Sequence, residues 1–211
     1  MPDGAGLLLD QAYRMHPDLR RYTSEVLYDG TLHGADGLGR QEILGEAPFC
    51  GPGLRVVQIP HEGNTNPSPE KADEVTRLTE TLAGCPVAGP RRYGPAGRPA
   101  AILIVTPYNT QIKAIQDAQA ARGLTRPQAV TVDKFQGRQA PVVIYSMPPP
   151  ADQAPRGPDF LYHRHRLNVA TSRARAMAII VASPDPIPVS CRTPHQMTLA
   201  NAPCRAWEER G

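Results

Sequence analysis

The sequence predicts an α/β domain with a mostly parallel sheet flanked by helices. Short apolar runs rich in valine and isoleucine alternate with amphipathic helical patterns along most of the 211 residues, and such alternation is typical of parallel sheets. The central runs are apolar throughout, as expected of strands covered on both faces. A chain of this length can bury one sizeable core. Because no internal repeat or composition break divides it, we expect a single domain over residues 1–211.

The apolar runs predict five strands. In chain order, the strands cover Leu54 to Ile59, Ala101 to Val105, Ala129 to Val132, Val142 to Ser146 and Ala178 to Ala182. The spacing of apolar residues predicts three helices. Their apolar faces are Leu19, Tyr22, Val26 and Leu27; then Val75, Leu78 and Leu82; and last Met197, Ala200, Cys204 and Trp207.

Pro17 is well placed as the first residue of the first helix, because its missing N–H costs nothing there. We expect His16 to orient this helix start and to have no chemical role. Two stretches rich in proline and glycine, residues 84–99 and 147–158, are predicted as irregular loops.

An arginine-rich segment, Arg166 to Arg175, precedes the last predicted strand. No Asp or Glu lies between Phe160 and Pro184, so no local carboxylate can pair with the arginines of this window. Guanidinium groups resist full burial unless they are paired. We therefore expect this segment to face an anion, and a phosphate is the natural candidate.

Composition narrows the class of protein only slightly. A formal charge of +3 is too small to argue for nucleic-acid binding, and the excess of twenty arginines over three lysines can also reflect a GC-rich genome. The four cysteines form no Cys-x-x-Cys pair, so neither a zinc site nor a disulfide framework is predicted. No signal peptide or membrane-spanning run is recognisable, and we expect a cytoplasmic protein with no membrane partner.

Polar segments follow two of the predicted strands. Residues 106–111 come directly after one strand, and residues 133–139 come after the next. In open parallel sheets, ligands bind beyond the carboxyl ends of the strands. These segments and the arginine-rich segment are therefore expected to gather phosphate-binding groups at the strand ends.

Five motifs in a fixed order resemble those of superfamily 1 helicases. They are Gln11-Ala12-Tyr13-Arg14-Met15-His16-Pro17, Tyr28-Asp29-Gly30, Thr106-Pro107-Tyr108, Thr131-Val132-Asp133-Lys134-Phe135-Gln136-Gly137 and Leu167-Asn168-Val169-Ala170-Thr171-Ser172-Arg173-Ala174-Arg175. The chain looks like the second RecA-like domain of the 5′-to-3′ branch that includes the nonsense-mediated-decay helicase and its bacterial relatives. This resemblance implies a RecA-like, P-loop-NTPase-type fold and a role in an ATP-dependent helicase.

The resemblance also implies the roles of individual residues. Arg173 and Arg14 correspond to the arginine fingers that reach the γ-phosphate of ATP, where they stabilise charge on the transferred phosphoryl group. Tyr13, Gly137 and Gln139 match nucleotide-binding positions, with Tyr13 near the adenine. Three further matches, Thr106, Tyr108 and Thr131, correspond to residues that bind the backbone of single-stranded nucleic acid.

Each assignment has a simpler alternative. Tyr13 can be a packed core aromatic, Arg14 can cap a helix or pair with Asp10 or Asp18, and Arg173 can be a surface arginine. The two threonines, Thr106 and Thr131, can simply end their strands.

Two departures from the family pattern bear on activity. Gln139 stands where relatives usually have a glutamate that accepts a ribose hydroxyl, and a neutral amide makes a weaker bond. The lysines Lys71, Lys113 and Lys134 all lie outside a Gly-Lys-Ser or Gly-Lys-Thr sequence, so the chain has no P-loop. We expect ATP and Mg²⁺ to be held mainly by a separate N-terminal P-loop domain, in cis or in trans, and this chain to be inactive alone. The alternative is a non-catalytic module that binds nucleic acid or docks on a partner, or a helicase remnant.

Overall fold

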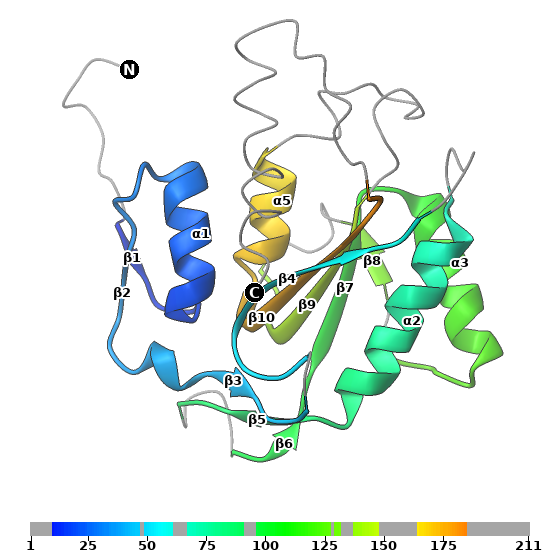
Figure 1. Cartoon of the computed structure of the whole chain (residues 1–211), viewed down its shortest axis with the longest axis horizontal. Coiled ribbons are helices and arrows are strands. Elements are labelled where there is room, and N and C mark those ends of the chain that lie inside the picture. Colours follow the sequence, from blue (N-terminus) through cyan, green and yellow to red (C-terminus); the bar gives the residue numbers. More distant parts are fainter. Residues whose placement is uncertain are drawn as a thin grey trace, which may run out of the picture.

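A five-stranded parallel sheet forms the centre of the molecule (Figure 1). The computed structural model describes residues 10–46, 49–60, 67–90, 96–127, 129–131, 137–147 and 164–184. The strands, in their order across the sheet, are β4 (Gly53–Gln58), β10 (Ala174–Ala182), β9 (Ala140–Ser146), β7 (Ile102–Thr106) and β8 (Ala129–Thr131). The predicted α/β class and mostly parallel sheet are confirmed.

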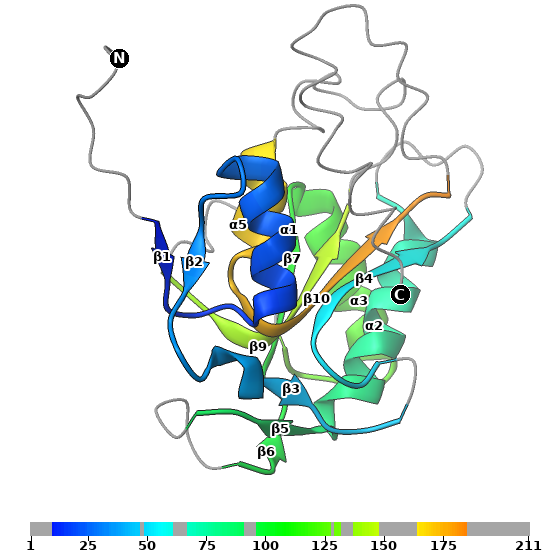
Figure 2. The same cartoon turned by 60° about the vertical axis from the view of Figure 1, so that its left-hand side comes forward.

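Two layers of helices cover the sheet. Helices α1 (Pro17–Leu27) and α5 (Arg164–Thr171) lie side by side on one face, and α2 (Pro69–Ala83) and α3 (Asn109–Ala121) cover the other (Figures 1 and 2). Every residue of the central strands β9 and β10 is consequently buried. This double cover explains why these strands are apolar on both faces.

The core is divided by the sheet into two clusters. Leu19 and Tyr22 of α1 pack in the same cluster as Ile180 of β10. On the opposite face, Val75 and Leu78 of α2 belong to the cluster that contains Ile144 and Ile179. Because successive strand side chains point to opposite faces, Ile179 and Ile180 serve different clusters.

The predicted strands are all present, with differences at their ends. The last strand begins at Ala174, four residues before its predicted start, so Arg175 lies inside a buried strand. Helix α1 begins at Pro17 as predicted. The sequence analysis missed α3 and α5, whose apolar stripes are weak because neither helix packs a broad face of large aliphatic side chains on the sheet. The predicted helix around Met197 to Trp207 lies outside the described residues.

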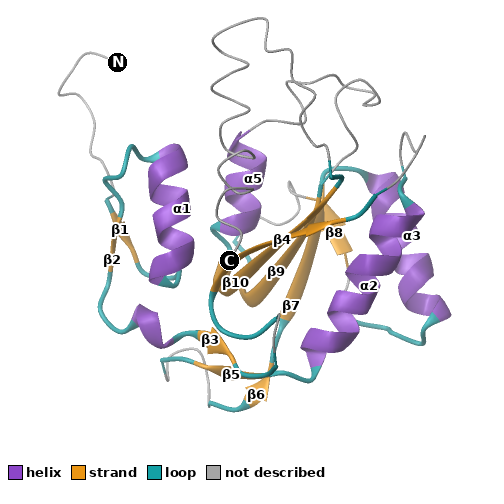
Figure 3. Ribbon diagram, in the orientation of Figure 1, coloured by secondary structure: helices purple, strands orange, loops and turns teal. Residues whose placement is uncertain are grey.

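Two smaller sheets flank the main one (Figure 3). Strands β1 (Gln11–Ala12) and β2 (His33–Gly34) form a parallel pair beside α1, and η1 (Leu38–Arg40) follows them. The antiparallel sheet contains β3 (Glu42–Ile43), β5 (Pro86–Ala88) and β6 (Arg98–Pro99). Residues 84–99, predicted as an irregular loop, therefore contribute two short strands. Apart from Met147, the second predicted loop, residues 147–158, lies outside the described residues.

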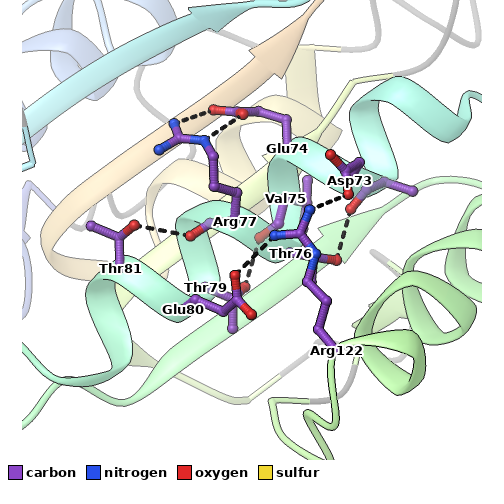
Figure 4. Close-up of polar contacts among 10 residues, drawn as sticks. Asp73, Glu74, Val75, Thr76, Arg77, Thr79, Glu80, Thr81 and Arg122 are labelled. Carbon is purple, nitrogen blue, oxygen red and sulfur yellow. Dashed lines mark hydrogen bonds and ion pairs between the residues drawn. The ribbon is translucent and has the colours of Figure 1, made fainter.

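Arg122, directly after α3, links the two helices on that face of the sheet (Figure 4). Its guanidinium donates to Asp73 and, at 2.9 Å, to Glu80, both on α2. On the same helix, Arg77 pairs with Glu74. Such ion pairs contribute little to stability, and only those of Arg122 connect the end of α3 to α2. None of the described helices is long and apolar enough to cross a membrane.

His16 caps the first helix through its ring. Nδ1 accepts a hydrogen bond from the Asp18 backbone N–H at 3.1 Å, and Nε2 lies 3.2 Å from the Gly39 carbonyl oxygen. Since Nδ1 accepts, Nε2 carries the proton and donates to Gly39. The backbone N–H of His16 also donates to the Arg175 carbonyl at 2.8 Å. The expected role of His16 in orienting the helix start is confirmed.

Replacing this cap gives a test of the local structure. We expect His16→Ala to lower the free energy of unfolding by about 1 kcal/mol, because the Asp18 N–H loses its acceptor. His16→Asn should retain most of that stability, since asparagine also caps helices. Chemical denaturation of the three proteins measures the difference, and equal midpoints for His16→Ala and the unsubstituted chain would contradict the capping role.

Candidate functional site

Polar groups gather at two opposite ends of the parallel sheet. Arg173 and Gln139 directly precede β10 and β9, so they lie at the amino ends of these strands. Thr106 and Thr131 are the last residues of β7 and β8, at the carboxyl ends. The sequence analysis expected one collection of groups at the strand ends, where ligands of parallel sheets usually bind. That expectation is correct for the threonines and wrong for the arginines, which occupy the opposite edge.

The amino-end site is a pocket of about 580 Å³. We call it the arginine pocket, and its polar lining includes Tyr13, Arg14, Gln139, Asn168, Ser172 and Arg173. The wall comes from the segment before α1, from α1 and the loop after it, from the residue before β9, and from α5 with the turn before β10. The fold therefore brings together both arginines that the motifs singled out, along with Tyr13 and Gln139.

Arg14 is held in the pocket by neutral groups. Its Nε donates to Gln139 Oε1 at 2.9 Å, and Nη1 donates to the Ser172 carbonyl at 3.1 Å. The backbone of Arg14 is fixed as well, because its carbonyl accepts a hydrogen bond from Gln41 Nε2 at 2.7 Å. Gln41 is 2 % exposed and was missed by the sequence analysis, since nothing in its local pattern marks it. Gln139 thus positions an arginine, a role that no motif indicated.

Arg173 lies in the turn between α5 and β10. Its carbonyl accepts a hydrogen bond from the Ala140 N–H at 3.2 Å, which joins the turn to the start of β9. The Nε atom of Arg173 and the Oδ1 atom of Asn168 are buried, and neither has a hydrogen-bond partner within the described residues. Buried polar atoms without partners are costly. Both residues line the arginine pocket.

The two other predicted nucleotide-binding residues differ in their surroundings. The Tyr13 side chain is 60 % exposed, so the alternative of a packed core aromatic is wrong. Its hydroxyl donates to Gln11. Gly137 has a φ of 87°, a left-handed conformation that favours glycine, and it starts the short exposed segment that leads to Gln139. Gly137 is not among the residues that line the pocket.

At the carboxyl end of the sheet, hydroxyl side chains form a row. Thr106 of β7 is paired in register with Thr131 of β8. On the other side of β7, Val105 pairs with Tyr145, so the next residue, Ser146, lies beside Thr106. The Thr106 and Ser146 hydroxyls are buried and have no hydrogen-bond partner within the described residues. Thr106 and Thr131 are also the last residues of their strands, as the simpler alternative expected.

Helix starts converge on this hydroxyl row. Ser68, the N-cap of α2, donates its N–H to Gln111 Oε1 at 2.8 Å, and Gln111 Nε2 returns a bond to the Ser68 carbonyl at 3.1 Å. Tyr108 is the N-cap residue of α3 and is 9 % exposed. Gln111 was noticed only as part of a polar segment, although it joins the starts of the two helices.

Lys71 is buried close to the hydroxyl row. The residue is 1 % exposed. Its Nζ donates to the carbonyl of Met147, the residue after Ser146, at 3.2 Å. Burial lowers the pKa of Lys71 from 10.5 to about 8, because the charged form loses hydration, while the neighbouring Glu70 opposes this change. In the part of the chain that the structure describes, no cluster of His, Cys, Asp and Glu is arranged to hold a metal ion.

The class of this protein follows from fold and site together. It is an α/β domain with a RecA-like parallel sheet that offers two arginines at one edge and a hydroxyl row at the other. The sequence profile of the AAA domain family matches residues 3–185. The chain therefore belongs to the AAA domain family, and the ordered motifs are correctly identified as those of a superfamily 1 helicase C-terminal domain.

Curated relatives agree with this identification. The chain is 28% identical over 188 residues to "Probable helicase MAGATAMA 3" of Arabidopsis thaliana, covering 83% of this chain and 22% of that protein. It is 29% identical over 191 residues to "Regulator of nonsense transcripts 1 homolog" of the same organism, covering 83% of this chain and 14% of the relative. The chain thus spans less than a quarter of the length of these two relatives.

The C-terminal domain of a possible DNA helicase from Lactobacillus plantarum WCFS1 has a TM-score of 0.45 and 17% sequence identity to this chain. The match covers 87% of this chain and 95% of the other.

The lowered pKa of Lys71 makes stability depend on pH. Between about pH 8 and 10.5, the unfolded chain keeps a proton on Lys71 that the folded chain has lost, so the free energy of unfolding rises with pH in this window. The rise attributable to Lys71 is on the order of 3 kcal/mol across the full window. Lys71→Met should lack it, and urea unfolding of both proteins at several pH values measures the difference. A gap between the two proteins that stays constant with pH would contradict this burial.

Proposed function

We propose that this domain is the C-terminal motor domain of an ATP-dependent DNA or RNA helicase. It supplies arginine fingers and nucleic-acid backbone contacts to a composite ATPase site, and a P-loop domain supplies the rest. The observation that carries this proposal is the meeting of Arg14 and Arg173 in one pocket, because residues 159 positions apart converge there. Membership of the AAA domain family supports the same proposal.

The polar lining of the arginine pocket fits a nucleoside triphosphate. Among the described residues, Arg173 Nε and Asn168 Oδ1 are buried and have no hydrogen-bond partner. Tyr13 is exposed and can lie against a planar base. When bound, ATP with Mg²⁺ would supply a phosphoryl group whose negative charge is redistributed during hydrolysis, and guanidinium groups held in place stabilise that charge.

The residues of this chain have different roles in that site. Gln139 and the Ser172 carbonyl orient Arg14 through 2.9 and 3.1 Å hydrogen bonds before any ligand arrives. Gln139 neutralises none of the arginine charge, because an amide is uncharged. Arg173 is fixed through its backbone by Ala140, which leaves its side chain to bind the γ-phosphate. Preorganised cations of this kind cost no reorganisation at the moment of reaction.

The opposite edge of the sheet is proposed to contact the nucleic acid. Thr106, Thr131 and Tyr108 lie together at the carboxyl ends of β7 and β8 and at the start of α3. The Thr106 hydroxyl, which has no partner among the described residues, can donate to a phosphate oxygen, and the N-terminus of α3 favours negative charge. The ATP and nucleic-acid contacts of this domain would therefore use different residues.

Removal of the finger is the direct test. In the protein that joins this domain to its P-loop domain, we expect Arg173→Ala to lower the hydrolysis rate by roughly 10³-fold or more, with a much smaller effect on nucleotide binding. Arg40→Ala is a matched control, since Arg40 is exposed and does not line the arginine pocket. Steady-state ATPase assays and nucleotide titration separate the two effects. Unchanged turnover in Arg173→Ala would rule out the finger assignment.

The hydroxyl row allows a test that separates binding from folding. Thr106→Val keeps the shape of the side chain and removes a buried hydroxyl that has no partner among the described residues, so stability should stay the same or rise by about 1 kcal/mol. Affinity for single-stranded DNA or RNA should fall, and fluorescence anisotropy at several salt concentrations measures it. Equal affinity of the variant and the unsubstituted protein would count against a nucleic-acid contact at Thr106.

A further inference from the structure

A second pocket of about 580 Å³ lies at the amino edge of the main sheet. Its walls are the residues before β7, the end of α2, the segment before β8 and the residue before Gln139. Two arginines, Arg126 and Arg138, line it, and all the other lining residues are alanine, isoleucine, leucine or proline. We call this the Arg126–Arg138 pocket.

The arginines and the apolar floor of this pocket favour a guest that carries both a negative charge and an aliphatic group. Both arginines are exposed, and neither has a hydrogen-bond or ion-pair partner within the described residues. No carboxylate lines the pocket. Two guanidinium groups can each bind a carboxylate or phosphate through paired N–H donors. The apolar floor, which includes Ala101 and Leu103, favours a guest that also brings aliphatic groups.

The pocket is built rather than incidental. The Pro127 carbonyl accepts a 2.9 Å hydrogen bond from Gln119 of α3, whose side chain is buried. This bond fixes the segment that carries Arg126. On the floor, the Ala101 carbonyl accepts from the Val142 N–H of β9 at 3.3 Å. The apolar floor and the segment beside it are therefore held by the sheet and by α3.

The two pockets are joined by one short segment. Arg138 lines the Arg126–Arg138 pocket, and the next residue, Gln139, lines the arginine pocket, where it accepts the hydrogen bond from Arg14. Both pockets thus flank the amino end of β9. A second domain that covers the arginine pocket can therefore also contact the Arg126–Arg138 pocket.

We propose that the Arg126–Arg138 pocket receives an acidic side chain of the P-loop domain when that domain closes on the nucleotide. The inference rests on the proposed function, because it takes the occupant to be the domain that completes the ATPase site. A side chain with an aliphatic stem covers the apolar floor, whereas a free phosphate leaves it bare. A nucleic-acid strand is disfavoured, since its proposed contacts lie at the opposite edge of the sheet.

Charge reversal in the joined protein tests this docking. Domain closure is measured by energy transfer between dyes on the two domains, in the presence of a non-hydrolysable ATP analogue. Arg126→Glu with Arg138→Glu should raise the analogue concentration that gives half-maximal closure by roughly tenfold or more, because two attractive contacts become repulsive. Lys113→Glu is the matched control, since Lys113 is an exposed cation of α3 that lines neither described pocket. Both arginines are exposed, so thermal unfolding should be unchanged.

The outcomes separate this inference from the proposed function. Restoration of closure by an acidic-to-basic substitution on the P-loop domain would identify the partner side chain. If closure is unaffected by the charge reversal while Arg173→Ala still abolishes hydrolysis, the docking inference is wrong and the proposed function stands. If hydrolysis survives Arg173→Ala, the proposed function itself fails. Loss of single-stranded nucleic-acid binding with normal closure would overturn docking in favour of a nucleic-acid contact.

Discussion

The hydrogen bond from the Ala140 N–H to the Arg173 carbonyl sets the geometry on which the rest of the amino edge depends. It aligns the starts of β9 and β10, whose register then pairs Ala140 with Ala174. Gln139 is thereby placed within 2.9 Å of Arg14, although the two are 125 positions apart in the chain. A shift of one residue in this register would turn the side chains of β9 to the wrong face and remove Gln139 from the pocket.

The sequence predicted the fold well where burial left a simple pattern. Strands β9 and β10 are buried along their whole length, so their apolar runs were recognisable. Helix α5 was missed because its residues serve the pocket and the turn before β10, which leaves no regular apolar stripe. The start of β10 was placed too late, since Arg175 reads as polar although it lies in a buried strand.

The candidate site was predictable in its residues but not in its arrangement. The order of the motifs identified Arg14, Arg173, Thr106 and Thr131. The motifs themselves do not indicate at which end of the sheet each residue lies. Arg173 precedes its strand and Thr106 ends its own, so a parallel sheet sends them to opposite edges. The supporting partner Gln41 is missed for another reason: it acts on the backbone of Arg14, and any residue with an amide at that point in space could do so.

The length of the central strands has a mechanical consequence. Strand β9 has seven residues, and at about 3.3 Å per residue it holds the two polar edges roughly 20 Å apart. No side chain spans that distance, so residues at one polar edge cannot contact residues at the other directly. Lateral pairing with β7 and β10 holds β9 in one register, so the two polar edges keep a fixed spacing.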